Sequence, residues 1–215
     1  MSSPIAARVG VLTLALLAVL SADGRAQVGA DQVARASSRI PSNGTRWLVD
    51  PAHSQVDFRV HHLVGRVRGT FDDWFGVIVT QDDDWTRGTV NVTVQTRSVN
   101  TGNANRDADL RSDRFFAADS FPRMTFESTG IVATDSTVEI GGILTIKGHS
   151  HHVVLTGQYR GTAKDYVGQQ RIAFDATTVV NRRDFGLEYA EMVNGVPGIG
   201  DDVEITIAIE AIRVN

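Results

Sequence analysis

The apolar residues of this sequence recur with a period of two from Trp47 to the C-terminus, and this period constrains the fold more than any other feature. It is clearest near the end, where Val203, Ile205, Ile207 and Ile209 are each separated by a single residue. Such alternation is typical of β-strands with one buried face. The same pattern predicts further strands over 55–62, 66–71, 75–79, 90–95, 124–126, 138–146, 153–159 and 171–176.

The connections between these segments contain Gly, Asp or Asn and show no helical period. The strands should therefore pair in an antiparallel sheet. A sheet with one apolar face throughout must close into a barrel or pack on a second sheet. The period breaks only between Gly102 and Pro122, where the polar stretch 103–114 is expected to form a short helical turn.

The N-terminal segments follow one another in the order typical of a secretory signal peptide. Arg8 precedes an apolar run over residues 9–20, and small residues follow near Ala26. That run is shorter than the ~20 residues needed to cross a bilayer, and the order of segments favours cleavage on export. We expect a signal peptide over 1–26, a flexible leader over 27–44 and one β-domain over 45–215, in the periplasm or secreted.

Composition limits the possible functions. The 215 residues include no Cys, which excludes disulfides, thiolate metal sites and a thiol nucleophile. The net charge of −4 does not indicate the excess of positive charge that is typical of nucleic-acid-binding proteins, so we expect no nucleic-acid partner.

The interior of the domain could be filled or hollow. Small residues on the predicted inner face leave room for a ligand, and these are Gly69, Gly142, Gly157 and Ala176. Alternation alone leaves both interiors open, because Gly within a strand also marks bulges and bends.

A series of short motifs occurs in order along the domain. They are WLVDPAHS (47–54), RSVNTG (97–102), RDADL (106–110), DRFF (113–116), FPRMTF (121–126), LTIKG (144–148), NRRDFG (181–186) and GDDV (200–203). In order and spacing they resemble the YceI-like family of exported bacterial polyisoprenoid-binding proteins. The resemblance implies an all-β, lipocalin-like, eight-stranded antiparallel barrel around a long apolar cavity. In this family the cavity holds an isoprenoid chain of the quinone or polyprenyl type.

On this interpretation the protein binds its lipid without catalysis and without a cofactor, as a periplasmic carrier or store. The candidate ligand-binding residues are on the predicted inner face or in the long connection. They are Phe58, Val60, His62, Phe71, Phe75, Val92, Val94, Phe115, Phe116, Phe126, Ile140, Leu144, Leu155, Tyr159, Phe174, Ile205 and Ile207.

Two other functions are left open. After Gly148 the family usually has a hydrophobic residue, Thr, a basic residue and Pro, whereas this chain has His149, Ser150, His151 and His152. Imidazoles are common metal ligands, so the first alternative is an exported metal-dependent hydrolase that uses this cluster. The second is a filled barrel that acts through its surface as a stress-related interaction protein.

The partner expected from the resemblance is the isoprenoid lipid itself. Aromatic residues in turn-rich segments, namely Trp74, Phe75 and Trp85, are candidates for a transient contact with a membrane surface. A homodimer through a barrel edge or mouth is a further alternative.

Overall fold

Eight strands close into an antiparallel barrel in the computed structural model, which describes residues 44–134 and 137–214. The expected signal peptide and nearly all of the expected leader lie outside the described residues. In barrel order the strands are β1 (Gly44–Val49), β4 (Trp74–Gln81), β5 (Asp84–Gln95), β7 (Arg123–Ala133), β8 (Val138–Ile146), β9 (His149–Lys164), β10 (Gln170–Asn181) and β13 (Ile199–Val214). The pairing of β13 with β1 completes the circle. The all-β, eight-stranded antiparallel barrel predicted above is confirmed.

β13 shares one of its edges between two strands. Its C-terminal part pairs with β1, and its earlier part pairs with β2 (Gln55–His62). A 3₁₀ turn, η1 (Pro51–His53), separates β1 from β2. The Ser54 hydroxyl there donates to the Glu210 carbonyl and accepts from the Glu210 N–H, at 3.1 and 2.8 Å. The chain therefore bends at η1 without leaving the Glu210 backbone unpaired.

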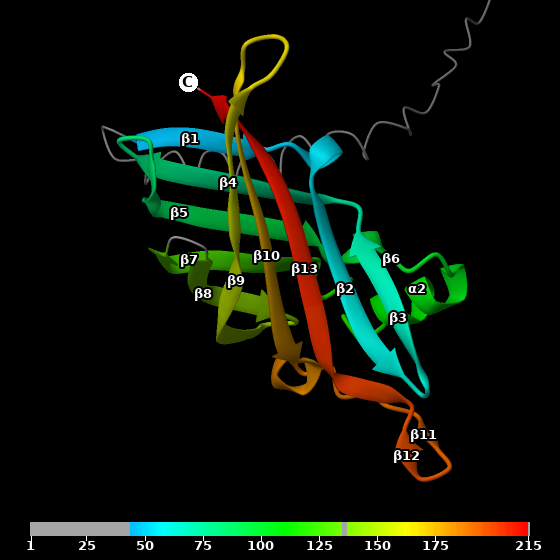
Figure 1. Ribbon diagram of the computed structural model, residues 1–215. Coiled ribbons are helices and arrows are strands. Elements are labelled where there is room, and N and C mark those ends of the chain that lie inside the picture. The colour runs from blue at the N-terminus through cyan, green and yellow to red at the C-terminus, as the bar shows by residue number, and fades with distance from the viewer. Residues whose placement is uncertain (1–43, 135–136, 215) are drawn as a thin grey trace, which may run out of the picture.

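β2 continues into a smaller ladder beyond the barrel proper. It pairs with β3 (Gly65–Phe71), which pairs with the short β6 (Val99–Asn100). Figure 1 shows β2 and β3 extending past the strands that run across them, with α2 (Ala104–Arg111) beside β3 and β6. The remaining elements are η2 (Thr96–Ser98), η3 (Arg182–Phe185), β11 (Met192–Val193) and β12 (Val196–Pro197).

The helix α2 is the helical turn expected within 103–114, and polar contacts hold it in place. Asn103 caps it by accepting from the backbone N–H groups of Asn105 and Arg106. The buried Asp107 accepts from the Thr101 N–H and hydroxyl, at 2.9 and 2.5 Å. Arg111 donates to the Val99 carbonyl at 2.7 Å. These bonds fix a helix whose sequence is mostly polar.

Two inward glycines do not leave the space that the sequence suggested. A Cβ on Gly69 would lie 2.5 Å from Phe58 Cζ, and a Cβ on Gly142 would lie 2.4 Å from Phe126 Cζ. The rings of Phe58 and Phe126 already fill the room that the missing side chains leave. Both rings line the cavity, so its wall at these positions is formed by Phe58 and Phe126.

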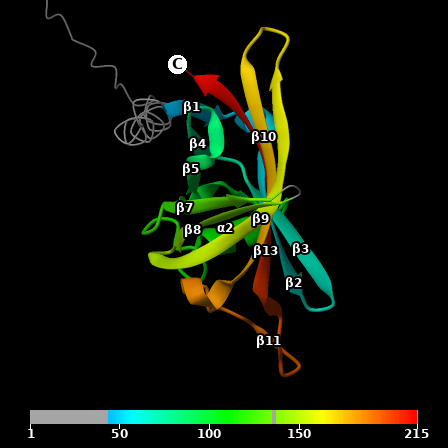
Figure 2. The ribbon, with the colours of Figure 1, turned by 60° about the vertical axis from the view of Figure 1, so that its left-hand side comes forward.

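Hairpins project from the two ends of the barrel. Figure 2 shows the β9–β10 hairpin at one end and the β11–β12 hairpin at the other, near the tip of β2 and β3. Within the described residues, no helix has the length and apolar character to cross a membrane.

Candidate ligand-binding cavity

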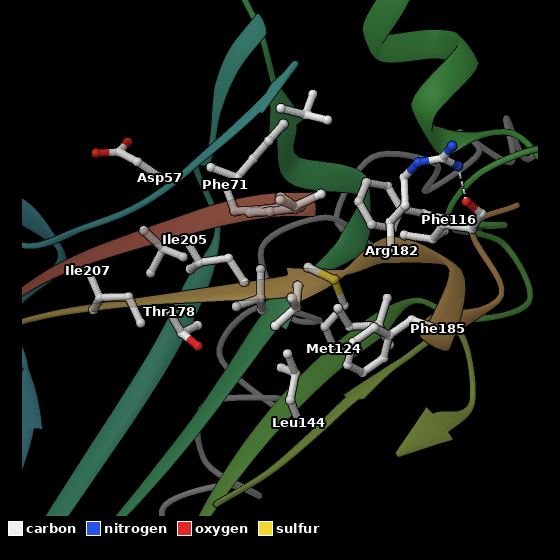
Figure 3. A pocket seen from close by; sticks show the side chains of 18 of the residues that line it. Asp57, Phe71, Phe116, Met124, Leu144, Thr178, Arg182, Phe185, Ile205 and Ile207 are labelled. Atoms are coloured by element: carbon white, nitrogen blue, oxygen red, sulfur yellow. Dashed lines mark hydrogen bonds between the residues drawn. The ribbon is translucent and has the colours of Figure 1, made fainter. Parts of the chain in front are cut away.

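The barrel encloses a cavity of about 580 Å³, within the range of ~300–1,000 Å³ that ligand pockets occupy. Ile205, Ile207 and Ile209 of β13 line it, as the alternation of that strand implies. Figure 3 shows Ile205, Ile207, Leu144 and Met124 around this space.

Most of the predicted ligand-binding residues contribute to the wall. Those that line the cavity are Phe58, Val60, His62, Phe71, Val92, Val94, Phe115, Phe116, Phe126, Ile140, Leu144, Leu155, Phe174, Ile205 and Ile207. Contact between these residues and a ligand stays a prediction. Phe75 and Tyr159 are absent from the wall.

Phe75 was assigned to the wrong face of its strand. On β4 the cavity-lining residue is Ile78. Residues on both faces of this strand are apolar, since Val77 and Ile78 are both buried. Alternation could not show which face of β4 points into the barrel. Phe75 is two positions before Val77, so it lies on the same face as Val77 and not on that of Ile78.

Tyr159 lies on the predicted face but beyond the end of the cavity. Its ring centroid is 5.1 Å from that of Trp85 and 5.3 Å from that of Phe174. Trp85 and Phe174 line the cavity, whereas Tyr159 is 37 % exposed and its hydroxyl contacts that of Thr162 at 2.6 Å. We call these three stacked rings the closed end of the cavity.

Trp85 is a lining residue that sequence reasoning missed. It was expected at a membrane-facing rim, yet it packs inside the barrel against Phe174, with ring centroids 5.4 Å apart. Val90, Val92 and Val94 of the same strand face the cavity. In a regular strand Trp85 would point outward, because it is an odd number of positions away from them. A register irregularity between β4 and β5 lies before Val90 and turns Trp85 inward. The exposure expected of Trp74 is also wrong, because Trp74 is 8 % exposed and part of the core.

The opposite end, which we call the mouth, is bordered by α2, by the segment after it and by residues 187–199. Phe115 packs edge-on against Tyr189, with centroids 5.3 Å apart. The Arg114 guanidinium lies 3.8 Å from the centroid of the Tyr189 ring and forms an ion pair with Asp109. The rings of Phe71 and Phe116 pack edge-on beside them, with centroids 5.9 Å apart. Aromatic and charged side chains therefore meet at the mouth.

Arg182 organises the segment that forms one side of the mouth. Its side chain is 4 % exposed and donates to the carbonyls of Leu187, Tyr189 and Gly200. It also forms an ion pair with Asp201 at 2.9 Å. Burial lowers the pKa of Arg182, and the nearby Asp201 carboxylate acts in the opposite direction. Figure 3 shows the guanidinium above Phe185 at the edge of the cavity.

Charge is distributed unevenly along the cavity. The charged or ionisable lining residues are Asp57 and His62 of β2, Arg106 and Asp109 of α2, Arg114 of the segment after it, and Arg182 and Glu191 of the chain after β10. Among the described residues, those that β5, β7, β8 and β9 contribute to the wall are uncharged. The part of the wall that these four strands form can therefore bury apolar groups, whereas charged side chains come from β2 and from the mouth.

The histidine cluster does not converge on one point. His151 Nε2 lies 2.9 Å from the Asp184 carbonyl oxygen, and its ring packs edge-on against Phe185. His149 lies beside Gly186, whereas His152 lies beside Gly141, on the other face of β9. His149 and His151 thus lie against the end of η3, whereas His152 points away from both.

Within the part of the chain that the structure describes, one other group of side chains has ligand atoms close enough together to bind a cation. It consists of Asp50, His53 and Glu210. Arg171 already lies between the carboxylates, with Nη1 2.9 Å from Asp50 and 2.5 Å from Glu210. His53 Nδ1 contacts Asp50 Oδ2 at 2.8 Å, within the turn between β1 and β2. The guanidinium takes the place that a metal ion would need.

Comparisons with known proteins agree with this fold. The YceI-like domain model matches residues 47–211. Protein YceI of Salmonella arizonae is 32 % identical over 162 residues, which is 75 % of this chain and 82 % of the relative. Among solved structures, the Campylobacter jejuni YCEI protein has a TM-score of 0.61 and 29 % identity, over 72 % of this chain and 90 % of that one.

More distant structures share the barrel. Burkholderia cenocepacia BcnA has a TM-score of 0.65 at 21 % identity, over 75 % of this chain and 98 % of that one. A polyisoprenoid binding domain from Saccharophagus degradans has a TM-score of 0.57 at 18 % identity, over 77 % and 97 %. With the family model matched over nearly the whole barrel and a relative of 32 % identity, this chain belongs to the YceI family.

Proposed function

We propose that this protein binds an isoprenoid lipid inside its barrel, without catalysis, as an exported carrier or store. The observation that carries the proposal is the long cavity, which has an uncharged, aromatic closed end and a charged mouth. A tail buried there would contact Val, Ile, Leu and Phe side chains, and the head group would remain near Arg114 and Glu191. The binding domain of Saccharophagus degradans has the same fold, but the proposal depends on the cavity.

The free energy of burial suffices for such a ligand. Removing apolar groups from water stabilises by about 0.8 kcal/mol per CH₂, so a tail of several isoprene units binds without polar contacts. Specificity then depends on the length and width of the cavity. The wall residues from β5, β7, β8 and β9 offer no charged group that could act as an acid or base.

The test is solvent extraction and native mass spectrometry of protein purified without detergent, followed by titration with a short-tailed quinone. We expect a bound species of isoprenoid mass, or saturable quinone binding that quenches the fluorescence of Trp85. A Leu144→Trp variant places an indole in the cavity and should bind far less. Its matched control is Ile143→Trp, because Ile143 directly precedes Leu144 in β8 and is 37 % exposed.

The outcomes separate the competing functions. Quinone binding by the wild type and by Ile143→Trp, with loss in a folded Leu144→Trp protein, supports a ligand inside the barrel. Equal binding by all three proteins would place the ligand elsewhere. Failure of the wild type to retain or take up any isoprenoid would contradict the proposal and favour a function at the outer surface.

A further inference from the structure

Two hairpin tips next to the mouth expose apolar side chains to solvent. Val64, in the turn between β2 and β3, is fully exposed, and its neighbour Leu63 is 40 % exposed. In the β11–β12 hairpin, Met192 and Val196 are 59 % and 57 % exposed. We call Leu63, Val64, Met192, Val193, Val196 and Pro197 the apolar tip. Figure 1 shows both hairpins projecting at the same end of the molecule.

The tip is built with a defined backbone. Leu63 has φ 51°, in the left-handed region that disfavours a residue with a branched apolar side chain. Among the described residues, the other non-Gly residues with positive φ are Asp82, Asp83, Ala117, Lys147 and Asn194, and Ala117, the only other apolar one, is buried. An apolar residue in a strained and exposed turn points to a functional role.

The second hairpin has a turn that needs no strain. Asn194 and Gly195 both have positive φ, 51° and 81°, as a tight two-residue hairpin turn requires. The Leu63 N–H donates to the Gly198 carbonyl at 3.0 Å, which joins the two hairpins. The tip is therefore a single connected surface.

This surface is continuous with the cavity. Val193 and Ile199 line the cavity, and both also line a shallow outer hollow together with Leu63, Val64 and Val196. An apolar path thus leads from the exposed tip, past Val193 and Ile199, to the interior of the barrel.

The end of the β2–β3 hairpin carries positive charge only, whereas Glu191 and Asp201 lie at the base of the tip, where Asp201 is ion-paired with Arg182 and Arg183. The segment from Arg59 to Arg68 contains three Arg and two His and no carboxylate, and residues 192–197 contain no charged side chain. Arg59 is paired with Glu204. Arg66 and Arg68 are exposed and form no ion pair with any residue that the structure describes. A cationic hairpin with an apolar end matches a membrane surface with anionic head groups.

We propose that the apolar tip inserts into the surface of an anionic lipid bilayer and presents the cavity mouth to it, so that the ligand moves between bilayer and barrel without crossing water. This inference rests on the proposed function, which supplies a membrane lipid as the ligand. It places the membrane contact at the apolar tip instead of at Trp74, Phe75 and Trp85, where the sequence placed it. The docking partner is the bilayer itself and not a protein.

The test is sedimentation of the full chain with vesicles made of equal parts phosphatidylcholine and phosphatidylglycerol. We expect the double variant Val64→Asp/Val196→Asp to bind roughly tenfold or more weakly than the wild type, because two apolar side chains no longer insert. Raising the salt concentration, or changing Arg66 and Arg68 to Gln, should weaken binding to these vesicles and leave binding to pure phosphatidylcholine unchanged. All variants share residues 1–43, so any difference in vesicle binding between them is caused by the substituted residues.

The matched control is Val167→Asp, because Val167 is 66 % exposed in a hairpin turn at the other end of the barrel. Its vesicle binding should equal that of the wild type. Equal binding by the tip variant, or a larger loss in Val167→Asp, would overturn the proposal. A tip variant that changes the oligomeric state in sedimentation, with no effect on vesicles, would also overturn it and assign the tip to a second copy of the chain.

A second measurement separates this inference from the proposed function. Titration with a short-tailed quinone in the absence of vesicles should give the same affinity for the wild type and for Val64→Asp/Val196→Asp, which also shows that the variant is folded. No quinone binding by the wild type would refute the proposed function. Normal quinone binding with tip-independent vesicle binding would refute the docking surface alone.

Discussion

The Phe126 ring lies directly over Gly142, at a distance that leaves no room for a Cβ on that glycine. An added Cβ would be 2.4 Å from Phe126 Cζ and 2.7 Å from the Glu127 carbonyl oxygen. The ring lines the cavity, and the carbonyl belongs to the paired strand β7. The wall of the cavity therefore depends on the absence of a side chain at this position.

Gly142→Ala should destabilise the barrel by about 1–3 kcal/mol, the usual cost of overpacking, and should reduce ligand uptake as Phe126 shifts inward. Urea unfolding and quinone titration measure the two effects. Gly130→Ala is the control on the same sheet, because a Cβ on Gly130 meets nothing within 4 Å. Unchanged stability in Gly142→Ala would show that the wall relaxes around the new methyl group.

Replacing Arg182 by Met should disorder one side of the mouth. The substitution leaves the Leu187, Tyr189 and Gly200 carbonyls without their donor, at a cost on the order of 3 kcal/mol. We expect a lower Tm and weaker quinone binding. Arg183→Gln should change either by little, because Arg183 is 43 % exposed although it pairs with the same Asp201. Similar losses in both variants would assign the effect to Asp201 instead.

The folded protein should become less stable at acid pH, because Arg171 is paired with the carboxylates of Asp50 and Glu210. Hydrogen bonds from Arg171, and then from His53, hold the pKa of Asp50 below its usual value. Ionised Asp50 therefore stabilises the folded protein above its unfolded pKa of about 3.9, and this stabilisation is lost as the pH falls through the lower folded pKa.

Arg171→Gln removes that contribution. The variant should be less stable than the wild type at pH 7, and the difference should shrink as the pH falls below about 4. Thermal unfolding at several pH values measures it. Arg160→Gln breaks the exposed pair with Asp175 and should have little effect at any pH. A difference that grows at acid pH would contradict the role given to Asp50.

Asp107→Ala should loosen α2 and make ligand exchange faster. Asp107 is 6 % exposed, and its loss leaves the Thr101 N–H and hydroxyl without an acceptor, at about 1–3 kcal/mol. Stopped-flow quinone release measures the exchange rate. Asp113→Ala is the control, since Asp113 is exposed and Lys147 contacts only its carbonyl. An unchanged release rate would show that the ligand leaves by a path that avoids α2.

Alternation identified the parts of the site that lie on regular strands. Val203 to Ile209 of β13 line the cavity as every second residue, because that strand keeps one apolar face against the interior. The order of the motifs, more than any single pattern, indicated a closed barrel. Strand pairing over long separations, such as Trp47 with Arg213, is not encoded in a local pattern.

The sequence misled where local geometry changes the parity of a strand or where both faces are apolar. The irregularity between β4 and β5 turns Trp85 inward, and the doubly apolar β4 conceals the direction of Phe75. The burial of Arg182 could not be predicted from the sequence either, because it depends on the carbonyls of residues five and seven positions later in the chain and on the ion pair with Asp201.

The cavity has ends made from separate segments of chain. The closed end is formed by Trp85, Tyr159 and Phe174, within paired barrel strands, whereas the mouth is formed by α2 and by residues 187–199 between η3 and β13. The length of the cavity and the chemistry of its mouth can therefore vary independently of each other, with the barrel itself unchanged.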